Sequence, residues 1–326
     1  PLAKFSASFG MIEAGSDPVL PVTLRNLEPF ITEDHAIVGK GSGLGAMAQV
    51  GGRMFKVGDP SDFPVWIKRI LEAQREKSHW DQQTEETVIE RMIGEDSVFT
   101  AAEVPFLSTF QLPKPNGAQA FEVMGIPIPK PGFYVVELAS HRLGLALHGQ
   151  PKPYHVQTAA LVTNMAAHFF KGRESSLVWV TALDRGTPVA GAKVTVADCP
   201  RKIFAQGVTD RDGLFKMQQE LPAAFQLPEC PGGERAFQVT ASLEDDVTFT
   251  LSSWDNGIER WSFNLPGPQD AKPQRIHTVL DRSLFRGGET VHMKHVLRKQ
   301  GSQGFSFVGK NSLPKKVLIR HAGGAF

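Results

Sequence analysis

Cysteine is nearly absent from this chain of 326 residues, which contains only Cys199 and Cys230. Two cysteines so far apart exclude a four-cysteine zinc site and a Cys-x-x-Cys redox pair. Two alternatives stay open. A disulfide would stabilise the fold by on the order of 3–4 kcal/mol and would require an oxidising compartment. Otherwise the two residues are free, buried thiols.

Long apolar runs are also missing, since no stretch approaches the ~18 residues that a membrane-spanning helix needs. The first residues, 1–6, have neither the apolar core nor the small-residue cleavage site of a signal peptide. They begin directly in a strand-like pattern and lack an initiator methionine. We therefore interpret the chain as a part of a larger protein.

The chain has no overall excess of charge, because 35 lysines and arginines nearly balance 34 aspartates and glutamates. This balance disfavours a nucleic-acid partner. Locally the pattern differs, because residues 290–326 contain no acidic residue. The basic residues Lys315, Lys316 and Arg320 form a candidate partner surface. Either an anionic partner or an acidic surface on a neighbouring domain would satisfy them.

Catalytic signatures are absent as well. The glycine cluster at 39–45 lacks the phosphate-loop pattern and is interpreted as a loop. The segment 210–213 lacks the later ligands of a calcium loop and is interpreted as a turn. His292 and His295 would point to opposite faces of a strand. Neither cysteine has a recognisable histidine or asparagine partner. We expect no enzyme activity, no catalytic residue, no cofactor and no metal.

The residues that are abundant indicate an all-β fold. The chain has 31 glycines and 23 prolines, which favour many turns between short strands. Residues 177–184 and 189–197 alternate as strands, and hairpins are predicted at 207–215 and 237–251. Short strands with a turn every 8–12 residues are typical of an antiparallel β-sandwich.

Residues 61–94 differ from this pattern and predict a helical hairpin inserted into the first β domain. Ser61 and Asp62 are suited to cap a helix, and apolar residues follow at helical spacing. A second amphipathic piece ends at Gly94. Trp66 and Trp80 either dock a partner or pack onto the parent sandwich.

Proline-rich residues 150–153 predict a boundary, because repeated prolines stiffen a connection that cannot join a sheet. The first domain is expected at 1–152, with the insert at about 61–94. A second sandwich is expected at 153–255. Residues 256–326 are expected to start a further domain that is incomplete, because ~100 residues are typical of a seven-stranded sandwich.

Residues 277–298 predict a strand, a tight turn at Gly287-Gly288 and a second strand. This segment resembles the opening of a macroglobulin-like domain, whose familiar form is Asp-Arg-x-x-Tyr-Arg-Pro-Gly-Glu-x-Val. Asp281, Arg282, Arg286, Gly288, Glu289 and Val291 match, while Phe285 replaces tyrosine and Gly287 replaces proline.

The chain as a whole resembles consecutive macroglobulin-like domains of the bacterial alpha-2-macroglobulin family. It is most similar to the large periplasmic subtype that lacks the thioester. The segments 161–165, 177–181, 198–199 and 254–258 carry this likeness. The family's thioester motif, Cys-x-Glu-Gln, has no match, and no bait segment can be assigned.

The resemblance implies a framework part of a broad-spectrum protease inhibitor, in which a cut bait segment triggers entrapment of the protease. Its partners would be the remaining domains of the parent protein and, through the parent, proteases. The implied location is the periplasm, with the parent anchored to the inner membrane. The alternative is a protein–protein interaction arm of a periplasmic envelope complex, which recruits other envelope proteins.

Overall fold

The computed structural model describes residues 2–25, 49–81, 86–113, 121–149, 152–172, 174–254, 260–264, 274–301, 304–316 and 318. They belong to two compact units, Pro1–Trp254 and Asp255–Phe326. The described elements are mostly strands in small sheets, nearly all antiparallel, and unit 1 has a helix near residue 60, so the predicted all-β class is confirmed. The glycine cluster at 39–45 and the boundary at 150–151 lie outside the described residues.

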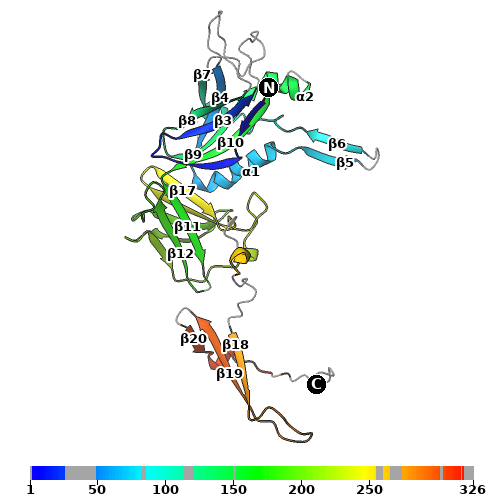
Figure 1. The fold of residues 1–326 in the computed structure, drawn as a ribbon, viewed down its shortest axis with the longest axis vertical. Helices are drawn as coiled ribbons and strands as arrows, with labels where there is room; N and C mark the ends of the chain where they lie inside the picture. The colour runs from blue at the N-terminus through cyan, green and yellow to red at the C-terminus, as the bar shows by residue number, and fades with distance from the viewer. Residues whose placement is uncertain are drawn as a thin grey trace, which may run out of the picture. The chain divides into compact units, whose positions relative to one another are not determined.

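The first sandwich of unit 1 packs a three-stranded sheet on a five-stranded one (Figure 1). The smaller sheet has the order β1 (Leu2–Phe5), β3 (Val19–Arg25), β8 (Phe121–Pro127). The larger has the order β2 (Phe9–Glu13), β10 (Tyr154–Thr163), β9 (Gly132–Ser140), β4 (Gln49–Val57), β7 (Ser108–Pro113). All described pairings in it are antiparallel except β2 with β10, which is parallel.

Strand β9 is buried on both faces, which explains its nearly continuous apolar sequence. Tyr134, Val136 and Leu138 face the core between the two sheets. Phe133 and Val135 face the opposite side, where helix α1 (Phe63–Ala73) and the second sandwich cover them. The five-stranded sheet is therefore the middle layer of unit 1.

The second sandwich packs a three-stranded sheet on a four-stranded one. The smaller sheet has the order β11 (Met165–Lys171), β12 (Ser176–Ala182), β15 (Leu214–Met217). The larger has the order β14 (Ile203–Val208), β13 (Lys193–Asp198), β16 (Phe237–Leu243), β17 (Asp246–Leu251). The predicted hairpin at 237–251 is confirmed, because β16 and β17 pair. The predicted hairpin at 207–215 is wrong. Its Asp-Gly corner carries the chain from one sheet to the other, so β14 and β15 pair with different strands.

The insert is half helix and half β-hairpin. Helix α1 begins at Phe63, after a short 3-10 turn at Pro60–Asp62, so the predicted helix start is confirmed. The predicted cap is wrong, because the Asp62 side chain caps nothing and Asp59 instead accepts from the Ser61 N–H. The predicted second helix is wrong, because β5 (Lys77–Asp81) pairs with β6 (Glu86–Arg91). The β-branched run at 87–89 favours an extended chain, and the pairing satisfies its backbone groups. Figure 1 shows this hairpin projecting from the sandwich.

Helix α2 (His141–His148) was not predicted. The short 3-10 helices are η2 (Val104–Phe106), η3 (Ala224–Gln226), η4 (Arg260–Phe263) and η5 (Lys310–Ser312).

Unit 2 contains one described sheet, β18 (Gln274–Leu280), β19 (Met293–Gly301), β20 (Gly304–Phe307). The predicted strand–turn–strand at 277–298 is confirmed, and Gly288 takes a left-handed φ of 87° in the turn. A further strand is expected at 315–320. Lys315, Lys316 and Leu318 lie in no strand, and Val317, Ile319 and Arg320 lie outside the described residues.

Candidate functional site

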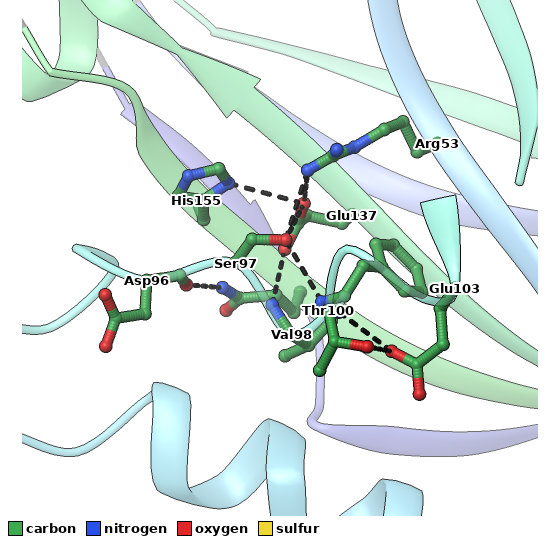
Figure 2. A network of polar contacts seen from close by, with 10 residues as sticks. Arg53, Asp96, Ser97, Val98, Thr100, Glu103, Glu137 and His155 are labelled. Atoms are coloured by element: carbon green, nitrogen blue, oxygen red, sulfur yellow. Dashed lines mark hydrogen bonds and ion pairs between the residues drawn. The ribbon is translucent and has the colours of Figure 1, made fainter. Parts of the chain in front are cut away.

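The most enclosed charged group of unit 1 is Glu137, near the end of β9, whose side chain has no exposed surface. Its position in the alternation places it on the same face as Phe133 and Val135. A carboxylate in such a place costs free energy unless neighbouring groups compensate its charge. Figure 2 shows those neighbours converging on it from three segments of the chain.

Two of the neighbours come from the adjacent strands. Arg53 on β4 stands directly opposite Glu137 in the sheet register, and its guanidinium binds the carboxylate. His155 on β10 contributes Nδ1, which lies 3.3 Å from Glu137 Oε1. Among the described contacts that nitrogen makes no well-formed hydrogen bond, so His155 approaches the Glu137 carboxylate closely without bonding to it. The sheet register thus places Arg53 opposite Glu137 and His155 diagonally across from it.

The third segment is the loop that follows the β5–β6 hairpin. Ser97 Oγ donates to Oε1 of Glu137 at 2.9 Å, and the Val98 N–H donates to Oε2 at 2.9 Å. Gln157 on β10 donates its side-chain amide to the Asp96 carbonyl at 3.1 Å. The carboxylate therefore attaches the returning end of the insert to the middle sheet.

The pKa of Glu137 reflects two opposing influences. Burial raises the pKa, because it disfavours the charged form. The His155 contact, the Val98 N–H and the Arg53 charge together lower it further than burial raises it, so the pKa lies below its ordinary value of 4.5. Glu137 is consequently ionised at neutral pH.

The surroundings of Glu137 assign it a structural role. General acid–base catalysis requires a carboxyl group within hydrogen-bond reach of a substrate. The Glu137 side chain is fully enclosed, and its oxygens already accept from Arg53, Ser97 and Val98. The network positions the insert on the sheet and offers its carboxylate to no external molecule.

A second cluster joins the two sandwiches of unit 1 through aromatic rings. Phe63 of α1 stacks on Phe133 of β9, with ring centroids 4.4 Å apart. Phe249 of β17 in the second sandwich meets Phe63 edge-on at 5.1 Å and also contacts Trp254 at 5.1 Å. Phe9 of β2 contacts Phe133, Phe249 and Trp254. One apolar core therefore continues from the first sandwich into the second.

Hydrogen bonds surround this junction. Asp246 accepts from Thr163 Oγ1 at 2.6 Å and from the Asn164 N–H at 2.9 Å, where β10 passes into β11. On the other side, Arg201 donates to Asp62 at 2.6 Å, next to helix α1. Gln238 donates to the Pro60 carbonyl at 2.6 Å. These contacts fix the orientation of the second sandwich on the first.

The two cysteines lie beside the same junction. Cys199 and Cys230 form a disulfide with their Cα atoms 5.1 Å apart. Cys230 is 4% exposed and packs in the core that contains Phe249 and helix α1. The bond links the end of β13 to the loop before β16, on the side that contacts the first sandwich.

The other residues singled out from the sequence occupy different environments. Trp66 is 5% exposed, and its ring packs against Phe55 and Phe99 within the core. Trp80 is 60% exposed on the projecting hairpin. Lys315 and Lys316 are exposed in unit 2, and Arg320 lies outside the described residues. The structure therefore does not gather these residues into one site.

Sequence reasoning missed Glu137, Arg53 and the ring cluster around Phe249. One signal was present, because Glu137 interrupts the otherwise apolar strand at 132–139, and a charge there demands a partner. Nothing local identifies Arg53 as that partner, since it lies 84 positions away.

Within the described parts of the chain, no group of three or more histidine, cysteine, aspartate or glutamate side chains is arranged to hold a metal ion. None of the helices in those same parts is both long and apolar enough to span a bilayer.

Comparison with known families gives one match. Residues 162–270 are similar to the family described as bacterial alpha-2-macroglobulin MG3 domain. The matched segment contains the second sandwich from β11 to β17. No curated protein matches the chain.

Among solved structures, the chain is similar to native alpha-2-macroglobulin from Escherichia coli spanning domains NIE–MG1, at 12% identity and a TM-score of 0.46. That match covers 77% of this chain and 96% of the other. The native conformation of the whole Escherichia coli protein gives 13% identity and a TM-score of 0.44, covering 91% of this chain and 15% of that one. Salmonella alpha-2-macroglobulin reacted with methylamine is similar at 13% identity and a TM-score of 0.42. That match covers 92% of this chain and 15% of the other. The chain thus spans about 15% of the length of these two whole proteins.

Proposed function

We propose that this chain is a framework portion of a bacterial alpha-2-macroglobulin-like protease trap, and that it performs no chemistry itself. The carrying observation is the continuous core that joins the two sandwiches through Phe63, Phe133 and Phe249. A shared apolar core resists hinge motion, whereas domains joined only by a linker move independently. Such a rigid spacer would hold distant parts of a trap in register.

The finer parts of this proposal rest on the resemblance. We assign the chain to the large periplasmic subtype that lacks the thioester, because the segments 161–165, 177–181, 198–199 and 254–258 resemble it. A disulfide between them favours an oxidising location such as the periplasm. The domain division at 1–152, 153–255 and 256–326 remains part of the proposal, with the first boundary moved to Asn164, because β10 (Tyr154–Thr163) pairs with β9 of the first sandwich. Its partners would be the other domains of the parent and, through them, proteases.

The test compares this chain with its parent protein in the presence of an active protease. We expect the chain alone to leave the digestion of a large protein substrate unchanged, and to retain no protease in a pull-down. The parent should slow that digestion while sparing the cleavage of a short peptide that reaches an enclosed protease. Capture of the protease by the chain alone would contradict the framework proposal.

A matched pair of variants tests the mechanical role within the parent. Phe249→Ala removes a ring that both sandwiches share, whereas Phe237→Ala removes a ring buried only inside the second sandwich. We expect Phe249→Ala to reduce trapping more than Phe237→Ala at equal loss of stability. If both variants trap the protease equally well, the rigid junction is not needed for trapping, and the mechanical role is rejected.

The alternative function, an interaction arm, is favoured by the projecting hairpin. Trp80 is 60% and Ile89 51% exposed, and two-stranded hairpins are rarely stable without contacts. A pull-down from bacterial envelope extract, with wild type and Trp80→Ser in parallel, distinguishes the two. A specific partner that Trp80→Ser loses would support the arm. A framework predicts no such partner and unchanged stability of Trp80→Ser.

A further inference from the structure

The sheet of unit 2 separates its residues into two unlike faces. Cross-strand partners lie on the same face, and neighbours along a strand lie on opposite faces. One face, which we call the mixed face, carries the apolar residues Ile276, Leu280, Met293 and Leu297 together with the polar residues Gln274, Thr278, His295, Lys299 and Ser306. The other, which we call the cationic face, carries Arg275, His277, Val279, Lys294, Val296, Arg298, Gln300, Phe305 and Phe307.

The two faces differ in how they fit a sandwich. The mixed face carries a single lysine or arginine, Lys299, and its Leu297 is only 9% exposed, so a second sheet covers this face at the lower cost in charge. On the cationic face, Arg275, Lys294 and Arg298 are exposed. Covering these charges with an apolar sheet would be costly, because they would lose their hydration without gaining partners. The cationic face is therefore the outer surface.

Charge is unevenly divided between the two units. Residues 255–326 contain 12 lysines and arginines against 5 aspartates and glutamates, whereas residues 1–254 contain 23 against 29. None of the strand residues on the cationic face is acidic. The turn between β18 and β19 contains Asp281 and Glu289, and Glu289 already pairs with Arg282 at 3.2 Å. The positive charge of this face is thus not compensated by its own strands.

Two aromatic rings stand among these cations. Phe305 is 57% and Phe307 is 78% exposed, and the Arg298 guanidinium lies 5.7 Å from the centroid of the Phe307 ring. The segment that follows continues the pattern, with exposed Leu313 among Lys310, Lys315 and Lys316. Exposed rings beside cations match a partner that presents negative charge at its surface and an apolar layer directly beneath it.

We propose that the cationic face binds the surface of an anionic lipid bilayer. Arg275, Lys294 and Arg298 contact lipid phosphates, while the rings of Phe305 and Phe307 enter the boundary between head groups and acyl chains. Clusters of four to eight basic residues bind anionic lipid in this way, and apolar insertion adds to the electrostatic attraction. An acidic protein surface would match the charge but would leave the two rings without an apolar layer.

The first experiment measures co-sedimentation of the full chain with vesicles of phosphatidylcholine alone or with about a third phosphatidylglycerol. We expect binding to the anionic vesicles only, weakened at high salt because screening shortens the electrostatic range. Arg298→Gln should weaken binding roughly fivefold, since each basic residue near an anionic surface contributes about 1 kcal/mol. Arg211→Gln, a control whose side chain is 92% exposed in unit 1, should bind as wild type does.

The second experiment reports insertion directly. Because Cys199 and Cys230 are paired, Phe307→Cys supplies a single free thiol for an environment-sensitive dye. We expect a blue shift of its emission on anionic vesicles, and none from the same dye at Phe225→Cys, a position 75% exposed in unit 1. Polyglutamate should produce no shift at either position.

Three results would overturn the proposal. The first is no binding to anionic vesicles. The second is binding that Arg298→Gln and Arg211→Gln reduce equally. The third is binding to polyglutamate as tight as to vesicles, without a dye shift on lipid, which would instead identify an acidic protein as the partner. Capture of proteases by the parent is measured separately, so failure here leaves the framework proposal intact.

Discussion

Glu137 is stable as a buried charge because three separate segments supply its partners. Arg53 comes from β4, His155 from β10, and Ser97 and Val98 from the loop after the hairpin. Removing one member of a buried ion pair typically costs about 3–5 kcal/mol, because the remaining groups stay desolvated. Here Arg53 retains some solvent contact, with 31% of its side chain exposed, which reduces the penalty for losing its partner.

We therefore expect Glu137→Gln to lower the free energy of unfolding by about 2–3 kcal/mol, measured by urea denaturation at neutral pH. Glu220→Gln, at an exposed position, serves as the control and should change it by less than about 0.5 kcal/mol. An equal effect of the two substitutions would contradict the role assigned to the network.

The stability difference between wild type and Glu137→Gln should depend on pH, in a direction set by the pKa of Glu137. The folded-state pKa of Glu137 lies below its ordinary value of 4.5, so its stabilising contribution is present above that value and is lost as the pH falls through the folded pKa. The difference in unfolding free energy between wild type and Glu137→Gln should shrink as the pH is lowered from about 6 to about 3. A difference that stays constant over this range would show that the charge contributes nothing.

Gly94 occupies the point where the insert returns to the sheet. Its φ is +74°, its carbonyl accepts from the His155 N–H at 2.7 Å, and a Cβ there would stand 2.6 Å from the Tyr154 ring. Gly94→Ala should cost about 2–3 kcal/mol of unfolding free energy, because strain and overlap add. Gly191→Ala has a similar φ of +80° with nothing within 4 Å, so it should show the backbone strain alone, about 1 kcal/mol. Equal losses would mean that the close approach to Tyr154 is unimportant.

At the scale of elements, the two halves of the insert have different roles, since one is buried and the other is exposed. Helix α1 buries Phe63, Trp66 and Ile70 against the middle sheet, so it belongs to the core. The β5–β6 hairpin buries none of its described side chains, and Lys77 and His79 both pair with Glu90 across the ribbon. The helix therefore contributes stability, and the hairpin supplies surface.

The disulfide is the covalent element of the junction. The double variant Cys199→Ala/Cys230→Ala should lose on the order of 3–4 kcal/mol of unfolding free energy, because the unfolded chain regains the entropy of a loop of about 30 residues. Reduction of the wild type should reproduce that loss, and a reductant should leave the double variant unchanged. Stability that does not respond to either treatment would show that packing alone maintains this part of the fold.

At the scale of the whole molecule, unit 1 behaves as one body because its two sandwiches share a core. A shared core predicts cooperative unfolding, in which neither sandwich melts before the other. Unit 2 has its own sheet, with mostly exposed side chains and the excess of positive charge described above.

Calorimetry of residues 1–254 tests this cooperativity. The wild type should unfold in a single transition. Phe249→Ala should split it into two, because it removes the ring that contacts Phe9, Phe63 and Phe133 of the first sandwich. Phe237→Ala, equally buried but inside the second sandwich, should lower the melting temperature without splitting the transition. Two transitions in the wild type would contradict a shared core.

Local sequence patterns were sufficient for the all-β class, the hairpin at 237–251, the turn at Gly287-Gly288 and the helix after residue 62. In each case neighbouring residues carry the information, through alternation, turn chemistry or the helical spacing of apolar residues. Tertiary structure decided the rest. Residues 86–91 form a strand because β5 pairs with them. Strands β14 and β15 do not form a hairpin because β14 pairs with β13 and β15 pairs with β12. Glu137 met Arg53 and Phe249 met Phe63 because sheet register and core packing join residues far apart in the chain, a relation that no local pattern encodes.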